Sequence, residues 1–252
     1  MNTPEESRAA EVRRKRIWYI AVPILSALVM VLMYFSGIPV LRQIITPTIE
    51  GIYGNSQREF GLLENLQNVL LLTMVIFAIR GAVRKEYLVE RVAFGGLACF
   101  ALFVFLEEID YGLHFYEYAR GIQSDEAAAN RNLHNVGDRT STIKRVVDLG
   151  MFVLFVVLPF GFHKSRNRYL RYLAPDRYSV FTLLGSVLVS QFAHFLNDRG
   201  FGDAANIGSN ISEFREYVTY WLFLLYIREL VFRRNLDDPP AESIEAAAST
   251  EP

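Results

Sequence analysis

The chain has 252 residues and a formal net charge of −1, which excludes the strong positive field typical of nucleic-acid-binding domains. Its single cysteine, Cys99, excludes an internal disulfide framework and a thiolate metal site. Hydrophobic residues form 52% of the sequence, and they are gathered in separate apolar blocks. Because about 18 or more apolar residues can cross the hydrocarbon core of a bilayer as a helix, these blocks predict membrane spans.

Six such blocks predict an all-α fold, a polytopic transmembrane helical bundle with six spans. In chain order the predicted spans cover residues 17–36, 61–79, 92–111, 146–162, 179–197 and 213–232. They form a membrane domain over residues 13–234, whose long outer loop at 112–145 we expect to contain helical structure of its own. Residues 1–12 and 235–252 are acidic and rich in Ala, Pro and Ser, so we expect two disordered cytoplasmic tails.

Small residues and a proline inside the spans predict local features of the bundle. Gly95 and Gly96 in the third span are expected to let a neighbouring helix approach closely. Pro159 in the fourth span lacks an amide donor, so we expect a kink there, which membrane helices tolerate.

The distribution of Lys and Arg predicts the orientation of the spans. Most of the 26 Lys and Arg residues fall before the first span, between the second and third, between the fourth and fifth, and around the end of the sixth. Basic residues collect in cytoplasmic loops, so these segments are expected to lie inside. Both termini are then cytoplasmic (N-in, C-in), which agrees with an even number of spans. The expected location is the bacterial inner (cytoplasmic) membrane.

Ionisable residues at membrane depth are costly and usually face a bundle interior or a cavity, so their positions carry the functional argument. The second span carries Glu64, Gln67 and Asn68 near its outer end, spaced so that they share one helix face. The inner halves of the spans are expected to hold almost no charge.

The end of the third span carries the densest group of acids. Glu107, Asp110 and His114 share a face if the helix continues through them, whereas Glu108 points elsewhere. All four residues are expected at the outer side of the membrane.

The remaining candidates also map to the outer side. His134 lies in an Asn-Leu-His-Asn segment of the outer loop, and His194 and Asp198 share a face at the end of the fifth span. Glu213 opens the sixth span. We therefore expect these side chains to meet the acids of the second and third spans in one pocket.

Carboxylates and imidazoles suit two kinds of chemistry, proton transfer and metal binding. The catalytic candidates are Glu64, Glu107, Glu108 and Glu213, and the candidate metal ligands are Asp110, His114, His134, His194 and Asp198. A divalent metal at such a site would be zinc, iron or manganese. A purely structural alternative stays open, in which nearby arginines neutralise the acids and the cluster only holds the outer loop in place.

The segment Glu107-Glu108-Ile109-Asp110-Tyr111-Gly112, followed by the Asn-Leu-His-Asn that contains His134, resembles a pattern in a family of uncharacterised bacterial multi-span membrane proteins. The likeness covers residues 60–220. It implies a multi-pass membrane fold and carries no established activity.

Two functions remain open from the sequence. The first is a membrane enzyme, with or without a metal, that acts on a lipid or lipid-linked substrate through the outer pocket. The second is a non-catalytic membrane subunit or transporter, in which the polar cluster is an ion-paired docking surface for other membrane proteins or an ion or proton site. Membrane lipid is an expected partner in both cases, and nucleic acid in neither.

Overall fold

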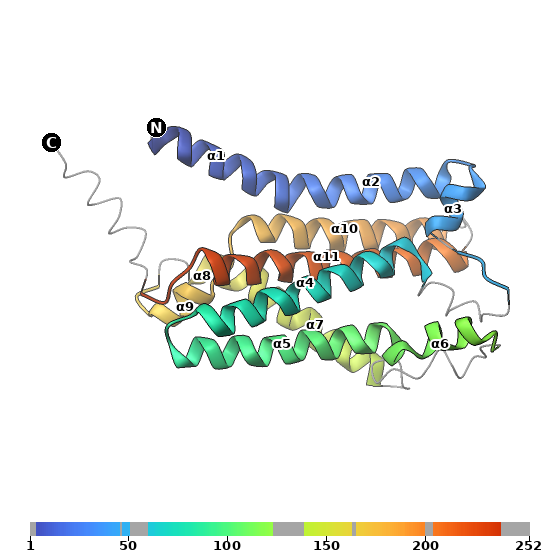
Figure 1. Ribbon diagram of the computed structural model, residues 1–252. Helices are drawn as coiled ribbons and strands as arrows, with labels where there is room; N and C mark the ends of the chain where they lie inside the picture. Colours follow the sequence, from blue (N-terminus) through green and yellow to red (C-terminus); the bar gives the residue numbers. More distant parts are fainter. Residues whose placement is uncertain are drawn as a thin grey trace.

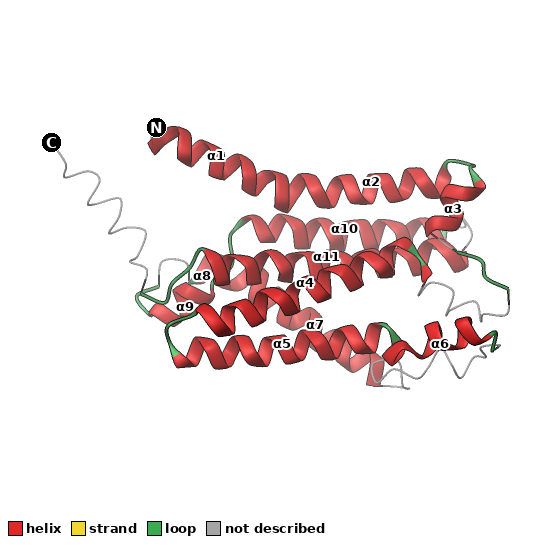
Figure 2. Cartoon of the chain, in the orientation of Figure 1, coloured by secondary structure: helices red, strands yellow, loops and turns green. Residues whose placement is uncertain are grey.

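The structure is a computed structural model that describes residues 4–45, 47–50, 60–122, 139–162, 165–199 and 204–237. Every regular element in this part of the chain is helical (Figure 2), which confirms the all-α prediction. The long helices run side by side in one bundle (Figure 1). In chain order the helices are α1 (Pro4–Arg16), α2 (Val22–Phe35), α3 (Pro39–Ile45), α4 (Leu62–Arg84), α5 (Leu88–Glu108), α6 (Leu113–Arg120), α7 (Arg139–Phe152), α8 (Leu158–Gly161), α9 (Arg168–Leu173), α10 (Tyr178–Asp198) and α11 (Ala204–Phe232).

The two ends of the bundle differ in the chain segments that they hold. One end, on the right in Figure 1, contains the beginnings of α4 and α11 and the end of α5, and we call it the acidic end. The opposite end contains α1, α9 and the end of α11, and we call it the basic end.

Each predicted span falls on helical structure, and part of that structure is suited to a membrane. Within the described residues, three helical segments are long and apolar enough to cross a bilayer: Ala9–Phe35, Leu62–Arg84 and Leu88–Glu108. A shorter apolar stretch, Tyr178–Phe192, lies in α10. Large apolar side chains such as Ile76 are exposed on these helices, a surface that is favourable in lipid and unfavourable in water. These features indicate a multi-pass membrane protein.

Helix α11 forms the centre of the bundle. It packs against both α4 and α10, and α5 packs against α4. The side chains of Val218, Leu222 and Ile227 on α11 are almost completely buried. Residues 213–220 of this helix lie next to α4 and α5, which positions the candidate site.

A glycine allows α4 and α5 to pack closely, but it is not one of the expected two. A Cβ atom at Gly81 of α4 would lie only 2.7 Å from the ring of Phe94 on α5, so a side chain there would collide with the ring. Gly95 and Gly96 have open space where a Cβ would stand. Their expected role in close packing is therefore wrong, because the contact face of α5 is the one that carries Phe94.

Two prolines are each preceded by a π-helical turn. Pro23 follows the turn Ile17–Ala21, and Pro159 follows the turn Val153–Val157. Proline lacks an amide hydrogen and its ring crowds the carbonyl group four residues earlier, and a wider turn relieves this crowding. The expected kink at Pro159 thus takes the form of a π turn. Its residue Phe155 is fully buried and packs edge-on against the ring of Tyr226 on α11.

The N-terminal segment differs from the expected disordered tail. Residues from Pro4 onward belong to α1. In its last turn, Nζ of Lys15 lies 3.2 Å from Oε1 of Glu11 and 2.6 Å from Oδ2 of Asp176. These ion pairs tie α1 to the segment before α10, which accounts for an ordered helix in a polar sequence. The expected outer loop carries α6, which confirms its helical structure, while residues 123–138 and 238–252 lie outside the described part.

Candidate functional site

Acidic side chains from three helices meet at the acidic end. The hydroxyl group of Tyr220 on α11 donates a hydrogen bond to Oε1 of Glu108 on α5, at 2.6 Å. Glu64 on α4 and Glu216 on α11 lie close enough to Tyr220 for electrostatic interaction with its hydroxyl group. Tyr220 can reach these acids because long helical side chains point toward the N-terminus of their helix, here the acidic end.

Gln67 joins the same group from α4. Its Nε2 donates hydrogen bonds to the backbone oxygen of Glu213 at 2.9 Å and to the Glu213 carboxylate at 3.4 Å. The Gln67 side chain is completely buried, and its Oε1 has no hydrogen-bond partner among the described residues. We call the whole group the carboxylate cluster: Glu64, Gln67, Glu108, Glu213, Glu216 and Tyr220.

The carboxylate cluster brings together three of the four catalytic candidates, with one difference from the expected arrangement. Glu108, which was expected to point away from the other acids, is the residue that reaches α11. Glu107 instead accepts a hydrogen bond from the hydroxyl group of Tyr111, and its side chain is only 4% exposed.

The expected common face of Glu107, Asp110 and His114 does not form. Helix α5 ends at Glu108, and Asp110 and Tyr111 adopt positive φ angles of 48° and 52°, followed by Gly112 at 81°. A left-handed residue other than glycine costs about 1–2 kcal/mol, so the helix cannot continue smoothly through this turn. Strained turns of this kind gather at functional sites. Here the turn brings the Tyr111 hydroxyl back onto Glu107 and buries the Asp110 side chain.

The candidate metal ligands are only partly described. His194 on α10 is exposed. The side chains of His114 and Asp198 and the whole of His134 lie outside the described part of the chain. Among the side chains that the structure describes, no three His, Cys, Asp or Glu residues are placed to hold a metal ion. The metal site therefore stays a prediction from the sequence.

A second polar group, at the basic end, was not expected from the sequence. Glu229 on α11 is buried, and it accepts a hydrogen bond from the Tyr19 hydroxyl at 3.0 Å. Arg234 pairs with the other carboxylate oxygen of Glu229 at 2.9 Å and donates to the backbone oxygen of Tyr172 at 3.1 Å. The expectation that the inner halves of the spans lack charge is therefore wrong for Glu229. The signal was an acid within the apolar run that ends the sixth predicted span.

Lys85 and Glu90 add a further buried pair at the basic end. Their side chains are 7% and 6% exposed, with 3.7 Å between Lys85 Nζ and Glu90 Oε1. Lys85 also donates to the backbone oxygen of Arg234, which joins the α4–α5 connection to the end of α11. The centre of the Tyr172 ring lies 5.5 Å from Lys85 Nζ, and burial raises the pKa of the Tyr172 hydroxyl.

Comparison of the chain with models of protein families, with curated protein sequences and with solved structures gives no match. The functional argument therefore rests on the geometry of the two polar groups.

Proposed function

We propose that the protein is a six-span protein of the bacterial inner membrane, with both termini in the cytoplasm and the acidic end at the periplasmic surface. The three apolar spans support this proposal, as do the positions of α7–α8, α10 and α11 on the other predicted spans. The arginines and lysines around α1 and α9 support the orientation, because basic segments remain in the cytoplasm. We also propose that the protein is related to the uncharacterised bacterial multi-span membrane proteins whose pattern the segment Glu107–Gly112 resembles.

We further propose that the carboxylate cluster acts as an acid–base site on a membrane lipid or a lipid-linked substrate. The observation that carries this is the contact of Tyr220 with Glu108, at a point where Glu64 and Glu216 also lie nearby. Neighbouring carboxylates can hold a proton between them, and a positioned acid or base speeds proton transfer to a bound substrate. In this proposal Glu108 exchanges a proton with the substrate and Tyr220 orients its carboxyl group.

The substrate class follows from the location of the cluster. It lies at the ends of apolar helices, where the reactive part of a lipid meets water. A substrate that approaches from within the bilayer brings its headgroup to this depth. The predicted zinc, iron or manganese ion is not needed for this step, and metal analysis of the purified protein tests that separate prediction.

The first experiment measures whether Glu108 exchanges a proton. Infrared difference spectra of the reconstituted protein, recorded between mildly acidic and mildly alkaline pH, are expected to contain a protonated-carboxyl band that Glu108→Gln removes. The matched control is Glu117→Gln on α6, outside the cluster, which should leave the band in place. An identical band in wild type and Glu108→Gln would contradict the proposed role of Glu108.

The second experiment tests the substrate class. Lipid composition is compared between cells that lack the protein and cells that carry the wild type or Glu108→Gln. The wild type is expected to restore a lipid species that Glu108→Gln does not restore, although both proteins are present at equal levels. A lipid composition that is the same in all strains would overturn the proposed enzyme.

Gln67 favours a second function, a proton or cation site in a transporter or a membrane subunit. Its Oε1 is a completely buried acceptor without a hydrogen-bond partner in the described part of the chain, and it lies beside Glu213. An amide oxygen among carboxylates is a suitable ligand for a small hard cation. Proteoliposomes decide between the two functions: proton or cation flux that Gln67→Leu abolishes, with unchanged lipid composition in cells, would support the transporter.

A further inference from the structure

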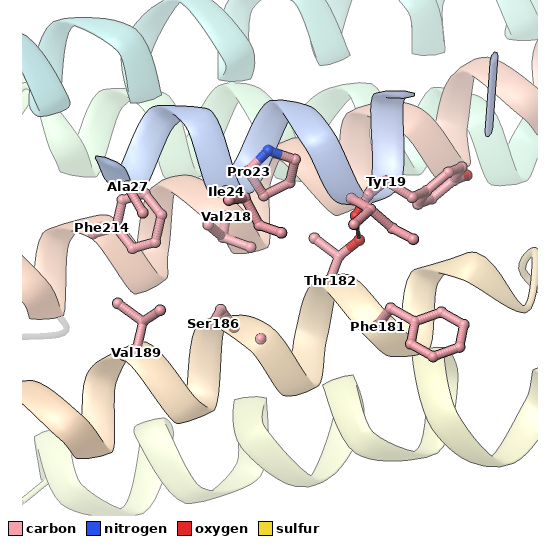
Figure 3. A pocket seen from close by; sticks show the side chains of 12 residues that line it. Tyr19, Pro23, Ile24, Ala27, Phe181, Thr182, Ser186, Val189, Phe214 and Val218 are labelled. Atoms are coloured by element: carbon pink, nitrogen blue, oxygen red, sulfur yellow. Dashed lines mark hydrogen bonds between the residues drawn. The ribbon is translucent and has the colours of Figure 1, made fainter. Parts of the chain in front are cut away.

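A pocket lies on the side of the bundle, between the first predicted span and α10. Figure 3 shows Thr182, Ser186 and Val189 of α10 facing Pro23, Ala27 and Phe214 across it. The pocket is open on one side, and its space of about 410 Å³ includes that open part. Its floor is formed by α11, through Phe214 and Val218.

The shape of the pocket is elongated along the bundle. The residues that α10 contributes run from Phe181 to Val189, and those that the first span contributes run from Tyr19 to Ala27. At about 1.5 Å per residue, eight residues of helix correspond to a groove about 12 Å long. A flexible linear molecule fits such a groove better than a rounded one.

The wall of the pocket is apolar toward an occupant. None of its described lining residues is charged, and the three hydroxyl groups among them already donate hydrogen bonds. That of Tyr19 donates to Glu229 at 3.0 Å. Thr182 donates to the backbone oxygen of Tyr19, and Ser186 donates to the backbone oxygen of Leu183 at 2.8 Å. Water gains little in such a space, since a water molecule in a cavity needs two to four polar partners.

The depth of the pocket indicates where its occupant comes from. One of its walls belongs to Ala9–Phe35, a segment long and apolar enough to cross a membrane, and the other belongs to the apolar stretch Tyr178–Phe192. The pocket therefore opens at the level of the lipid hydrocarbon. The occupant with the right shape, chemistry and abundance at that level is the chain of a lipid.

The pocket is also next to the carboxylate cluster. Glu213 and Phe214 are consecutive residues on α11: Glu213 contacts Gln67 in the cluster, and Phe214 lines the pocket. Consecutive helical residues differ by about 100° in direction, so one turn of α11 faces both sites. The pocket and the cluster therefore lie on different faces of the same stretch of α11.

We propose that this side pocket binds one acyl chain of a membrane phospholipid beside the carboxylate cluster. The inference rests on the proposed function in naming the substrate class, but the binding itself is measured separately. The elongated shape, the apolar wall and the position at hydrocarbon depth all select a single extended hydrocarbon chain.

The variant that tests this is Gly185→Leu. Gly185 lines the pocket, and a Cβ at this position has no heavy atom within 4 Å, so a side chain can begin there without a collision and is expected to fill part of the pocket. Gly150 on α7 is the matched control, because it also has open space at the Cβ position but does not line the pocket. Both changes add the same side chain to an apolar helix, and only one of them fills the pocket.

The two tryptophans of the chain provide the readout. Trp18 precedes the lining residue Tyr19, and Trp221 lies one turn beyond the lining residue Val218, with 5.6 Å between the centres of the two indole rings. Bromine atoms quench tryptophan fluorescence on close approach. The protein is reconstituted in vesicles that contain an increasing share of a phospholipid brominated on its acyl chains.

We expect the wild type and Gly150→Leu to show quenching that saturates at a low share of brominated lipid, followed by the linear rise caused by bulk lipid. Gly185→Leu should lose the saturating part and keep the linear part. Purely linear quenching in the wild type, or an equal loss in both variants, would overturn the proposal. Native mass spectrometry that finds an isoprenoid lipid or a second copy of the chain in place of the phospholipid would overturn the chosen occupant.

The same samples separate this proposal from the proposed function. Glu108→Gln should keep the saturating quenching while it fails to restore lipid composition in cells. Saturating quenching together with an unchanged lipid composition would leave the chain-binding pocket in place and refute the enzyme. Restored lipid composition by Gly185→Leu, at the wild-type level, would refute the role of the pocket in substrate binding.

Discussion

The two ends of the bundle differ in the side chains that contact their buried carboxylates. At the basic end Glu229 pairs with Arg234, and Glu90 lies beside Lys85, so each carboxylate has a cationic partner. At the acidic end Glu108 and Glu107 each accept a hydrogen bond from a tyrosine hydroxyl group. An ion pair keeps a carboxylate ionised, whereas a hydroxyl group can accompany both protonation states of its partner.

This difference predicts that one end stabilises the bundle and the other carries the function. The basic end joins the π turn Ile17–Ala21, α4, α5, α9 and α11 through interactions that are lost if one partner is removed. In the proposed function, the acidic end supplies the acids that exchange protons. We therefore expect changes at the basic end to affect stability and changes at the acidic end to affect function.

The largest effect is expected from Glu229→Ala. The change leaves the Arg234 guanidinium largely buried without its carboxylate and removes the acceptor of Tyr19. Removing one partner of a buried ion pair costs about 3–5 kcal/mol, so thermal unfolding in detergent should shift to a much lower temperature. Arg166→Gln, at an exposed position of the same end, is the control and should change little. Equal unfolding temperatures for Glu229→Ala and wild type would show that this end does not hold the bundle together.

A smaller change in stability, with a large change in function, is expected from Tyr220→Phe. The variant keeps the ring and removes only the hydrogen bond to Glu108, which is worth about 1 kcal/mol. Because the hydroxyl orients the carboxyl group, the infrared band assigned to Glu108 should shift in frequency. Tyr116→Phe on α6, an exposed position, serves as the control. If the band is unchanged while stability falls by several kcal/mol, the contact is structural and the comparison of the two ends fails.

The smallest change in stability is expected from Tyr111→Asn. Asparagine tolerates a left-handed backbone better than tyrosine, so relief of strain at a φ of 52° offsets the lost hydrogen bond to Glu107. The unfolding free energy should stay within about 1 kcal/mol of wild type, the order of the strain at one such residue. Restoration of lipid composition in cells should nevertheless fall. Unchanged restoration would mean that the strained turn serves neither Glu107 nor the site.

Much of the fold could be predicted from the sequence, because apolar runs of membrane length have few alternatives to a helix. The approximate limits of most helices followed from that pattern, and so did the gathering of acids at one end of the bundle. The partners of individual side chains did not. A helical spacing rule assumes that the helix continues, and the left-handed turn at Asp110 and Tyr111 breaks this assumption after Glu108. The same limit applies to Gly81, whose packing role depends on where the Phe94 ring lies on another helix.

The basic-end network was missed for a different reason. Glu229 lies within the sixth predicted span. Its partner Arg234 lies beyond that span, and Tyr19 is 210 residues away in the chain. Patterns within one segment contain no information about such contacts. A buried acid near the end of an apolar run is nevertheless a usable signal that a cation is close.

The central place of α11 has a consequence for how the protein is made. Translation produces α4, α5 and α10 before α11, so the glutamates of the early helices enter the bilayer while Tyr220 and Arg234 have not yet been synthesised. An acid exposed to hydrocarbon is costly, and the hairpin of α4 and α5 carries such acids until α11 is inserted between its neighbours. In the proposed six-span arrangement, burial of these acids is therefore completed only when this last helix is inserted.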